Sequence, residues 1–173
     1  DLDKLVDIVA ALEPTFGGIN LEDIKAPECF EIEQTLKKEM KIPVMHDDQH
    51  GTAIISAAAL LNALELVEKN IEDIRIVVSG AGAAAISCLR FYVTLGVKKE
   101  HIIVCDKEGV IRTDRPGLIG EHLEFATSQN FTTIAEAMPG ADVFLGLSAG
   151  NIISPEMIQS MAANPIVFAL ANP

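Results

Sequence analysis

The feature that most constrains the fold is a glycine-rich turn in the run RIVVSGAGAAAISCLRFYVTL at residues 75–95. The apolar start of this run predicts a short strand, and residues 83–95 predict a helix. Between them, Gly80, Gly82 and Ala85 form the pattern G-x-G-x-x-A. Gly80 permits a tight bend, Gly82 has no Cβ to keep a phosphate away, and Ala85 lets the helix pack closely. This pattern between a strand and a helix predicts a dinucleotide-binding turn.

An acidic residue follows the next predicted strand, at the place where such a turn needs one. Residues 101–105, HIIVC, predict a second strand that ends at Asp106, roughly 20 residues beyond the glycines, where an acid can accept bonds from the adenosine ribose. Asp106 would repel a 2′-phosphate and so favours NAD over NADP, although Lys107 and Arg112 lie close enough in sequence to offset it. The alternative is a βα turn that needs small residues for packing alone.

Strands and helices alternate from residue 73 onward, which predicts an α/β fold with a doubly wound parallel sheet. The expected strands are 74–79, 102–106, 143–147 and 166–170, and the expected helices are 83–95, 132–137 and 155–162. Residues 109–112 could add a short strand, and 113–130 read as a loop. The predicted fold class is a Rossmann-like dinucleotide-binding domain preceded by a short α/β segment.

The preceding segment is expected to be α/β as well. Helices are expected at 2–12 and 27–40, strands at 16–21 and 42–45, a polar exit at 46–50, and a helix buried on most sides at 51–67.

Two pairs of acids stand out in this segment. Glu22-Asp23 and Asp47-Asp48 each follow a short predicted strand. If the two strands are neighbours, the four carboxylates converge, and a hard cation such as Mg²⁺ or Mn²⁺ would relieve their repulsion. The alternative is two solvated acidic turns in an acidic protein.

Composition excludes some classes of partner. The chain has 13 Lys plus Arg against 25 Asp plus Glu, a formal net charge of -12, which argues against nucleic acid and against an anionic membrane surface. Three cysteines in apolar surroundings indicate reduced thiols in a cytoplasmic protein. The apolar residues 52–61 are followed by Asn62 and Glu65, which favours a core helix over a membrane span.

These motifs together resemble the malic enzymes, specifically the bacterial type. The resemblance covers nearly the whole chain and rests on GINLEDI at 18–24, APECF at 26–30, IPVMHDDQHGTA at 42–53, SGAGAAA at 79–85, LGLS at 145–148 and FALANP at 168–173. It implies oxidative decarboxylation of malate to pyruvate and CO₂, with NAD or NADP and with Mg²⁺ or Mn²⁺. It also implies residues 1–50 as part of the substrate and metal domain, and 51–173 as the dinucleotide-binding domain.

The resemblance assigns roles to individual residues. It implies that Glu22, Asp23 and Asp48 hold the divalent ion, and that the neighbouring Asp47 orients catalytic groups. The residues expected around the cofactor are Gly80, Ala81, Gly82, Ala83, Ala84, Asp106, Ser148 and Asn172.

The family's catalytic Tyr and Lys lie before the point where this sequence begins. We therefore expect the sequence to be the middle part of a longer polypeptide and to be inactive alone. The apolar helices suggest a homodimer or higher homo-oligomer. The competing hypotheses are a non-catalytic nucleotide-binding module for regulation or assembly, which needs no metal, and a two-metal hydrolase, which needs no dinucleotide.

Overall fold

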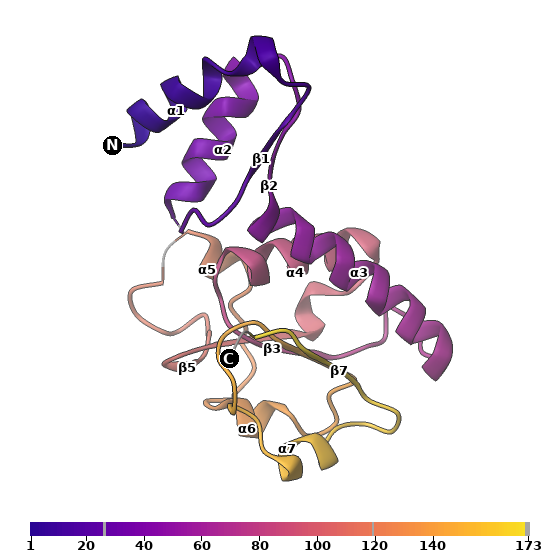
Figure 1. The fold of residues 1–173 in the computed structure, drawn as a ribbon. Helices are drawn as coiled ribbons and strands as arrows, with labels where there is room; N and C mark the ends of the chain where they lie inside the picture. The colour runs from indigo at the N-terminus through magenta and orange to yellow at the C-terminus, as the bar shows by residue number, and fades with distance from the viewer. Residues whose placement is uncertain (26, 119, 172–173) are drawn as a thin grey trace. The chain divides into compact units, whose positions relative to one another are not determined.

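The computed structural model describes residues 1–25, 27–118 and 120–171, and the chain forms two compact units, Asp1–Thr52 and Ala53–Pro173. Each unit is described by itself, and Figure 1 shows the elements of both. The assignment of these units to parts of a longer enzyme stays a prediction.

The smaller unit packs two helices on a two-stranded parallel sheet. Its helices are α1 (Leu2–Ala10) and α2 (Glu28–Glu39), and its strands are β1 (Ile19–Leu21) and β2 (Val44–His46). A 3-10 turn, η1 (Glu13–Thr15), follows α1. The apolar positions of these elements form one core, made of Val6, Leu21, Ile32, Leu36, Met40 and Val44. The helical and strand periodicities in the sequence therefore predict this unit correctly, apart from the ends of its elements.

The polar stretch at residues 46–50 is not the loop that the sequence predicts. Helix α3 (Asp47–Val67) begins at Asp47, four residues earlier than expected. The two acids at its start lie where helix N–H groups have no partner inside the helix and where negative charge is favourable. The D-D pair therefore begins the helix and does not precede it.

The expected burial of α3 on most sides is also wrong. Ala57, Leu60 and their neighbours one turn away are buried in the larger unit, but Ile55 is 68% exposed and Leu66 is 85% exposed. By length and composition α3 could cross a membrane, and 28% of its apolar window is buried. Its buried residues belong to the same core as the central strands, which is the placement of a core helix.

The larger unit is built on a five-stranded sheet with the strand order β5-β4-β3-β6-β7. The strands are β3 (Ile76–Ser79), β4 (Ile102–Asp106), β5 (Gly109–Val110), β6 (Val143–Gly146) and β7 (Ile166–Ala169). All neighbours pair in parallel except β4 and β5, which form an antiparallel hairpin at one edge. The prediction of a doubly wound parallel sheet is confirmed.

Alternate residues of the strands enter two separate cores, as the two-residue period of a β-strand requires. Ile76 and Val78 pack with α3 and with α4 (Ala83–Leu95), whereas Val77 packs on the opposite face. That second face is covered by α6 (Ile134–Ala137) and α7 (Pro155–Gln159), as Figure 1 shows. Helices on both faces explain why the strands read as continuous apolar runs.

The loop expected at 113–130 contains structure that its sequence does not reveal. It includes the one-turn helix α5 (Glu121–Glu124), and Thr127 forms a parallel bridge to Arg112. A further 3-10 turn, η2 (Lys99–His101), leads into β4. Short elements of this kind depend on contacts with the rest of the domain, because one helical turn has little stability of its own.

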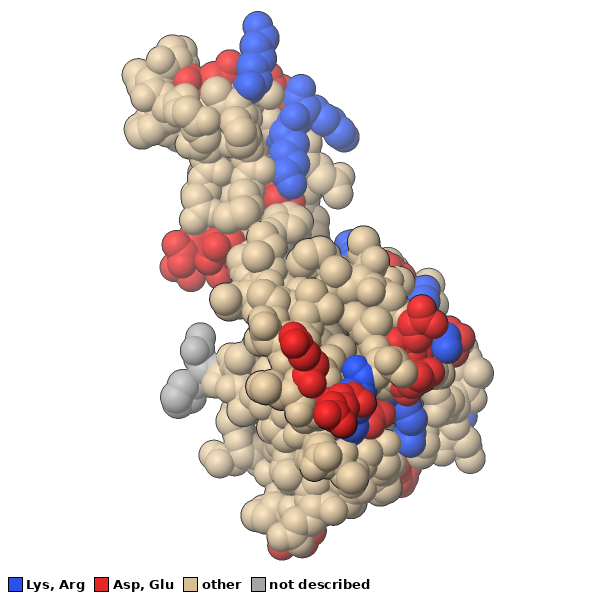
Figure 2. Space-filling model, turned by 90° about the vertical axis from the view of Figure 1, so that its right-hand side faces the viewer, with Lys and Arg blue, Asp and Glu red and all other residues tan. Residues whose placement is uncertain are grey.

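Several basic side chains of the larger unit are paired with acids. Figure 2 shows Lys and Arg side chains beside Asp and Glu in the lower part of that view. Arg90 contacts Glu124 at 2.6 Å, and Lys69 contacts Asp142 at 2.7 Å. On the larger unit in this view, blue side chains lie next to red ones and do not form a continuous basic surface.

Candidate functional site: a glycine turn and two acid pairs

The turn after β3 has the geometry that its glycines predict. Gly80 has a φ of +116°, and a Cβ there would lie 3.1 Å from the carbonyl carbon of Leu147, so the position requires glycine. Gly82 differs, because its φ is -80° and nothing lies within 4 Å of the place that a Cβ would take. Packing within the protein therefore does not require glycine at position 82. The close approach of a phosphate to this turn would explain why glycine is present there.

The start of α4 is open to a ligand. Gly82 is its N-cap, with an extended conformation, and no side chain caps the helix. The N–H groups at the start of a helix lack intrahelical partners and carry a partial positive charge. Residues 81–84 thus present the backbone donors that a pyrophosphate needs.

The turn lies at the point where the sheet reverses its winding. The chain runs outward from β3 to β4 and then returns to place β6 on the other side of β3. Ligands of doubly wound sheets bind outside the carboxyl ends of strands at this switch point. Ser79 ends β3 and Ser148 follows β6, and their hydroxyl oxygens are 2.6 Å apart in a hydrogen bond.

A cavity of about 580 Å³ opens beside this turn. Its lining includes Ser79, Asp106 and Ser148, so the structure brings two of the predicted cofactor residues to one pocket. The pocket is also lined by residues that sequence reasoning did not select, including Thr132 and Ile152. Asn172 lies outside the residues that the structure describes.

Asp106 is already paired with an arginine. Arg115 donates to both carboxylate oxygens of Asp106, and the N–H of Glu108 donates to one of them at 2.8 Å. Burial raises the pKa of Asp106, but the hydrogen bonds from Arg115 and the Glu108 N–H outweigh this effect, and the net pKa is lowered from its usual value. Asp106 is thus a carboxylate whose charge is largely compensated.

Arg115 was not predicted as a partner of Asp106, because it lies in a loop without periodicity. The sequence suggested Lys107 and Arg112 as the cations near Asp106. Arg112 instead donates to both oxygens of Asp114 and to Asn130. Arg115 lies nine residues after Asp106, and the β4–β5 hairpin between them turns the chain back. No local sequence pattern predicts this approach.

His122 is a second residue that the sequence did not reveal. Its Nε2 lies 3.1 Å from the carbonyl oxygen of Ala81, within the glycine turn. A carbonyl oxygen can only accept, so Nε2 carries the hydrogen in this contact. The one-turn helix α5, which the sequence did not predict, therefore links the loop at 113–130 to the proposed pyrophosphate cradle.

The two acid pairs lie at one edge of the small sheet. Strands β1 and β2 are parallel, with Leu21 opposite His46, so each pair follows its strand at the same end. The N–H of Asp23 donates to Oδ2 of Asp48 at 2.9 Å, which joins segments 25 residues apart. Asp23 has a φ of +57°, a conformation that costs energy outside glycine and is concentrated at functional sites.

The carboxylates do not form a closed cluster. Among the residues that the structure describes, no group of three His, Cys, Asp or Glu side chains is placed to hold a metal ion. The backbone brings Glu22, Asp23 and Asp48 to one edge, while the side chains of this acidic set stay separate, as unscreened like charges do. The roles of these three residues remain predictions.

Buried polar atoms beside Asp48 lack partners. The His46 side chain is fully buried, and neither ring nitrogen forms a hydrogen bond; Nε2 is 3.9 Å from Asp48 Oδ2, too far for one. Nε2 of Gln49 is buried without a partner as well. Unpaired buried donors are costly, so these orphans fit a site that is completed by a ligand. The carboxylates of Glu22, Asp23 and Asp48 would offer only oxygen atoms as metal ligands, which suits Mg²⁺ or Mn²⁺.

Asp47 is the first residue of α3. A Cβ at Gly51 would collide with the Asp47 carboxylate, so glycine at that position gives the acid its space. This is a physical reason for the glycine in the string HDDQHGTA. The role of Asp47 in orienting catalytic groups stays a prediction.

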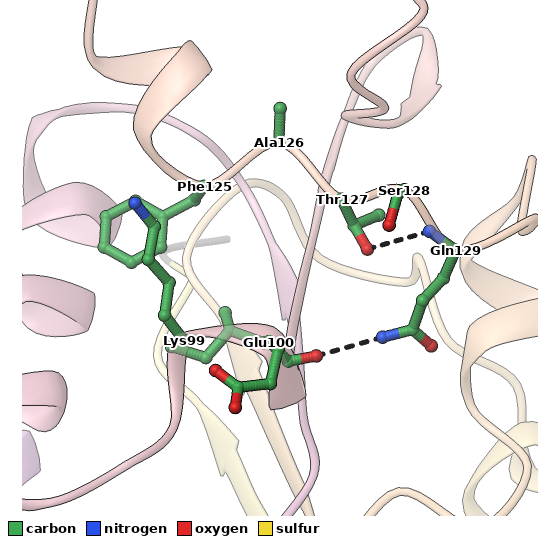
Figure 3. A pocket seen from close by; sticks show the side chains of 8 residues that line it. Lys99, Glu100, Phe125, Ala126, Thr127, Ser128 and Gln129 are labelled. Atoms are coloured by element: carbon green, nitrogen blue, oxygen red, sulfur yellow. Dashed lines mark hydrogen bonds between the residues drawn. The ribbon is translucent and has the colours of Figure 1, made fainter.

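A second cavity, of about 310 Å³, lies at the opposite end of β4 from Asp106 (Figure 3). The Lys99 ammonium lies 5.4 Å from the centre of the Phe125 ring, and Gln129 donates to the carbonyl of Glu100 at 3.0 Å. This cavity lies at the amino end of β4, whereas the switch point lies at the carboxyl ends of the strands. It therefore does not belong to the predicted dinucleotide site.

Comparison with known proteins gives matches along the whole chain. The family model for the malic enzyme NAD-binding domain matches residues 49–173, and the model for the malic enzyme N-terminal domain matches residues 1–37. An NADP-dependent malic enzyme of Haemophilus influenzae is 58% identical over 100% of this chain. An NAD-dependent malic enzyme of Rhizobium meliloti is 56% identical over 99% of it.

Solved structures agree with these matches. The crystal structure of the NAD-dependent malic enzyme of Thermotoga maritima covers 100% of this chain with a TM-score of 0.91 and 45% identity. The chain spans 47% of that structure, and 23% of the Haemophilus influenzae protein and 22% of the Rhizobium meliloti protein. The family models and the folds of both units together show that this chain belongs to the malic enzyme family.

Proposed function

We propose that the protein containing this chain catalyses the oxidative decarboxylation of malate to pyruvate and CO₂, with NAD(P)⁺ as hydride acceptor and a divalent cation. The observation that carries this proposal is the hydrogen bond from the Asp23 N–H to the Asp48 carboxylate. It ties the two acid pairs together at one sheet edge. A dinucleotide turn alone would support many dehydrogenases, whereas the joined acids are suited to a metal-assisted decarboxylation.

The reaction removes a hydride from C2 of malate and a proton from the C2 hydroxyl, and then breaks the C3–C4 bond. The hydride reduces NAD(P)⁺, CO₂ leaves, and the electron pair left behind is protonated at C3 to give pyruvate. When bound, a divalent cation would supply Lewis-acid chemistry at the C2 oxygen and stabilise the negative charge that develops after CO₂ departs. Glu22, Asp23 and Asp48 would hold that cation, and Asp47 would orient the catalytic groups.

The larger unit would bind and orient the cofactor. Backbone N–H groups at residues 81–84 would hold the pyrophosphate, and Asp106 would accept from the adenosine ribose. Ser148 would contribute a hydroxyl at the switch point, where Ser79 fixes its orientation through their hydrogen bond.

The direct test uses the full-length polypeptide with L-malate, Mn²⁺ and either NAD⁺ or NADP⁺. We expect malate-dependent formation of reduced cofactor, with one pyruvate released for each cofactor reduced, and loss of turnover when the metal is chelated. Metal-independent reduction that yields oxaloacetate without CO₂ would contradict the proposal.

Residues 1–173 produced alone are expected to bind dinucleotide without turning malate over. The single tyrosine of the sequence, Tyr92, is fully buried, and burial raises its pKa far above the usual value, so it is not available as an acid or base. Lys25, the lysine nearest to the first acid pair in sequence, is paired with Glu28 at 3.2 Å. Steady reduction of NAD(P)⁺ by the isolated piece would show that this expectation is wrong.

We also propose that the Asp106–Arg115 pair sets the choice between NAD and NADP. Asp106→Ser should shift kcat/KM toward NADP by about tenfold, because it removes a charge that repels the 2′-phosphate and frees Arg115 to bind it. Arg115→Gln should shift the ratio toward NAD, because it leaves the Asp106 charge uncompensated. Steady-state kinetics with both cofactors measure the ratio, and two variants that leave it unchanged would refute the role of this pair.

A further inference from the structure

Glu33 is a buried carboxylate that neither the sequence motifs nor the proposed chemistry use. It lies on α2 and is 5% exposed. Among the described side chains that carry a carboxylate, it is the one in the buried class. Burying an ionised carboxylate is costly unless it is paired, so its position calls for an explanation.

The partners of Glu33 lie on both sides of the Asp47-Asp48 pair. The backbone N–H of His46 donates to Oε1 of Glu33 at 3.0 Å. The same oxygen lies 2.8 Å from Nε2 of His50, a close polar contact. Through these two contacts, Glu33 holds the residue before the acids and a residue in the first turn of α3.

A third contact of Glu33, to Lys37, offers a simpler explanation for this carboxylate, namely an ion pair within α2. The Lys37 ammonium lies 2.8 Å from the same oxygen, one helical turn along α2, and its side chain is 44% exposed. Pairs of this kind at i and i+4 contribute little to stability in water. The Lys37 pair alone would not require burial, and it does not account for the bond to His46.

Charge compensation at Glu33 is consistent with a fixed carboxylate. Burial raises its pKa, and the close contacts with Lys37 and His50 lower it by more, so the net pKa is below the usual value. The carboxylate is thus ionised at neutral pH and can hold its donors throughout the range in which the enzyme would work.

We propose that Glu33 is a positioning residue that fixes the start of α3 and, through it, the Asp48 carboxylate at the Asp23 backbone. This inference rests on the proposed function, because it gives Glu33 a purpose only if Asp48 binds a cation. The contacts follow a defined path: Glu33 holds His46 and His50, these flank Asp47 and Asp48, and Asp48 accepts from Asp23.

The test compares Mn²⁺ binding and kinetics of the full-length protein in five forms. These are the wild type, Glu33→Gln, Glu33→Leu, Lys37→Met and Asp48→Asn. We expect Glu33→Gln to raise the Kd for Mn²⁺ by about tenfold, the usual effect of removing a group that orients a metal ligand. The KM for malate should rise with it, while the KM for NAD(P)⁺ stays unchanged. Glu33→Leu should act in the same direction and more strongly.

Hydrogen exchange without metal provides a separate readout. Because Glu33→Gln loosens the start of α3, the Asp23 amide should lose protection, while the amides of β3 and β4 keep theirs. Lys37→Met keeps the contacts of Glu33 with His46 and His50, so the Mn²⁺ affinity and the protection of the Asp23 amide should change much less than in Glu33→Gln. If Lys37→Met reproduces Glu33→Gln, the i,i+4 pair explains the residue and the inference is overturned.

The outcomes separate this inference from the proposed function. If Asp48→Asn does not weaken Mn²⁺ binding, the metal site itself is wrong. If Asp48→Asn weakens binding and Glu33→Gln only lowers the melting temperature, Glu33 has a structural role alone and the inference fails.

Discussion

Asp48→Asn in the full-length protein is expected to lower kcat/KM for malate by at least ~100-fold, because it removes the charge of one proposed cation ligand. Asparagine is nearly isosteric and keeps an oxygen that can accept from the Asp23 N–H, so the local fold should persist. The loss should therefore appear in turnover and Mn²⁺ affinity and not in the melting temperature. Steady-state kinetics at saturating and limiting Mn²⁺ measure it.

Glu39→Gln is the matched control for that variant. Glu39 is the last residue of α2 and is exposed, in the same unit as Asp48. The substitution removes one negative charge from the same acidic unit without touching either acid pair. Equal losses in the two variants would mean that net charge, and not a cation site, explains the effect.

Gly82→Val is expected to abolish dinucleotide binding, with a rise in Kd of at least ~100-fold, while leaving the protein folded. The backbone at Gly82 is extended with a φ of -80°, which valine adopts, and no atom lies within 4 Å of the place that its Cβ would take. The valine side chain would instead occupy the space over the helix start where a pyrophosphate approaches. Titration of NAD(P)H fluorescence gives the affinity, and thermal unfolding gives the stability.

Gly80→Ala provides the contrasting variant. Its Cβ would press on the backbone of Leu147 and would force an L-residue to a φ of +116°. We expect it to destabilise the domain by about 1–3 kcal/mol, the usual range for strained backbone. If Gly82→Val unfolds the protein as Gly80→Ala does, or if it still binds dinucleotide, the assignment of this turn is wrong.

The sequence predicts the central sheet well because its signals are local. Four apolar strands, the helix at 83–95 and the glycine turn each follow from periodicity and backbone restrictions within a few residues. The helix α4 begins and ends at the predicted residues, Ala83 and Leu95. Gly96 ends it with a φ of +120°, a conformation that only glycine adopts readily.

Features that depend on long-range contacts could not be predicted. The D-D-Q-H stretch reads as a polar loop, yet it begins α3, because its acids stabilise a helix start and Glu33 holds the residues on both sides of them. Arg115 and His122 reach Asp106 and the glycine turn from a loop without periodicity. In each case the partner lies in another part of the chain, and no local sequence pattern predicts the contact.

The acid pairs illustrate what sequence spacing can and cannot give. Spacing placed each pair after a strand, and the parallel register of β1 and β2 brings both pairs to one edge. The resemblance, and not the spacing, selected three ligands from the four acids.

The most direct test of the account is anomalous diffraction from crystals of the full-length protein grown with Mn²⁺ and NAD(P)⁺. The account predicts one manganese peak bonded to carboxylate oxygens of Glu22, Asp23 and Asp48 at about 2.0–2.3 Å, with the pyrophosphate on the Gly80–Ala84 turn. A manganese peak away from these acids, or a dinucleotide bound elsewhere, would contradict it.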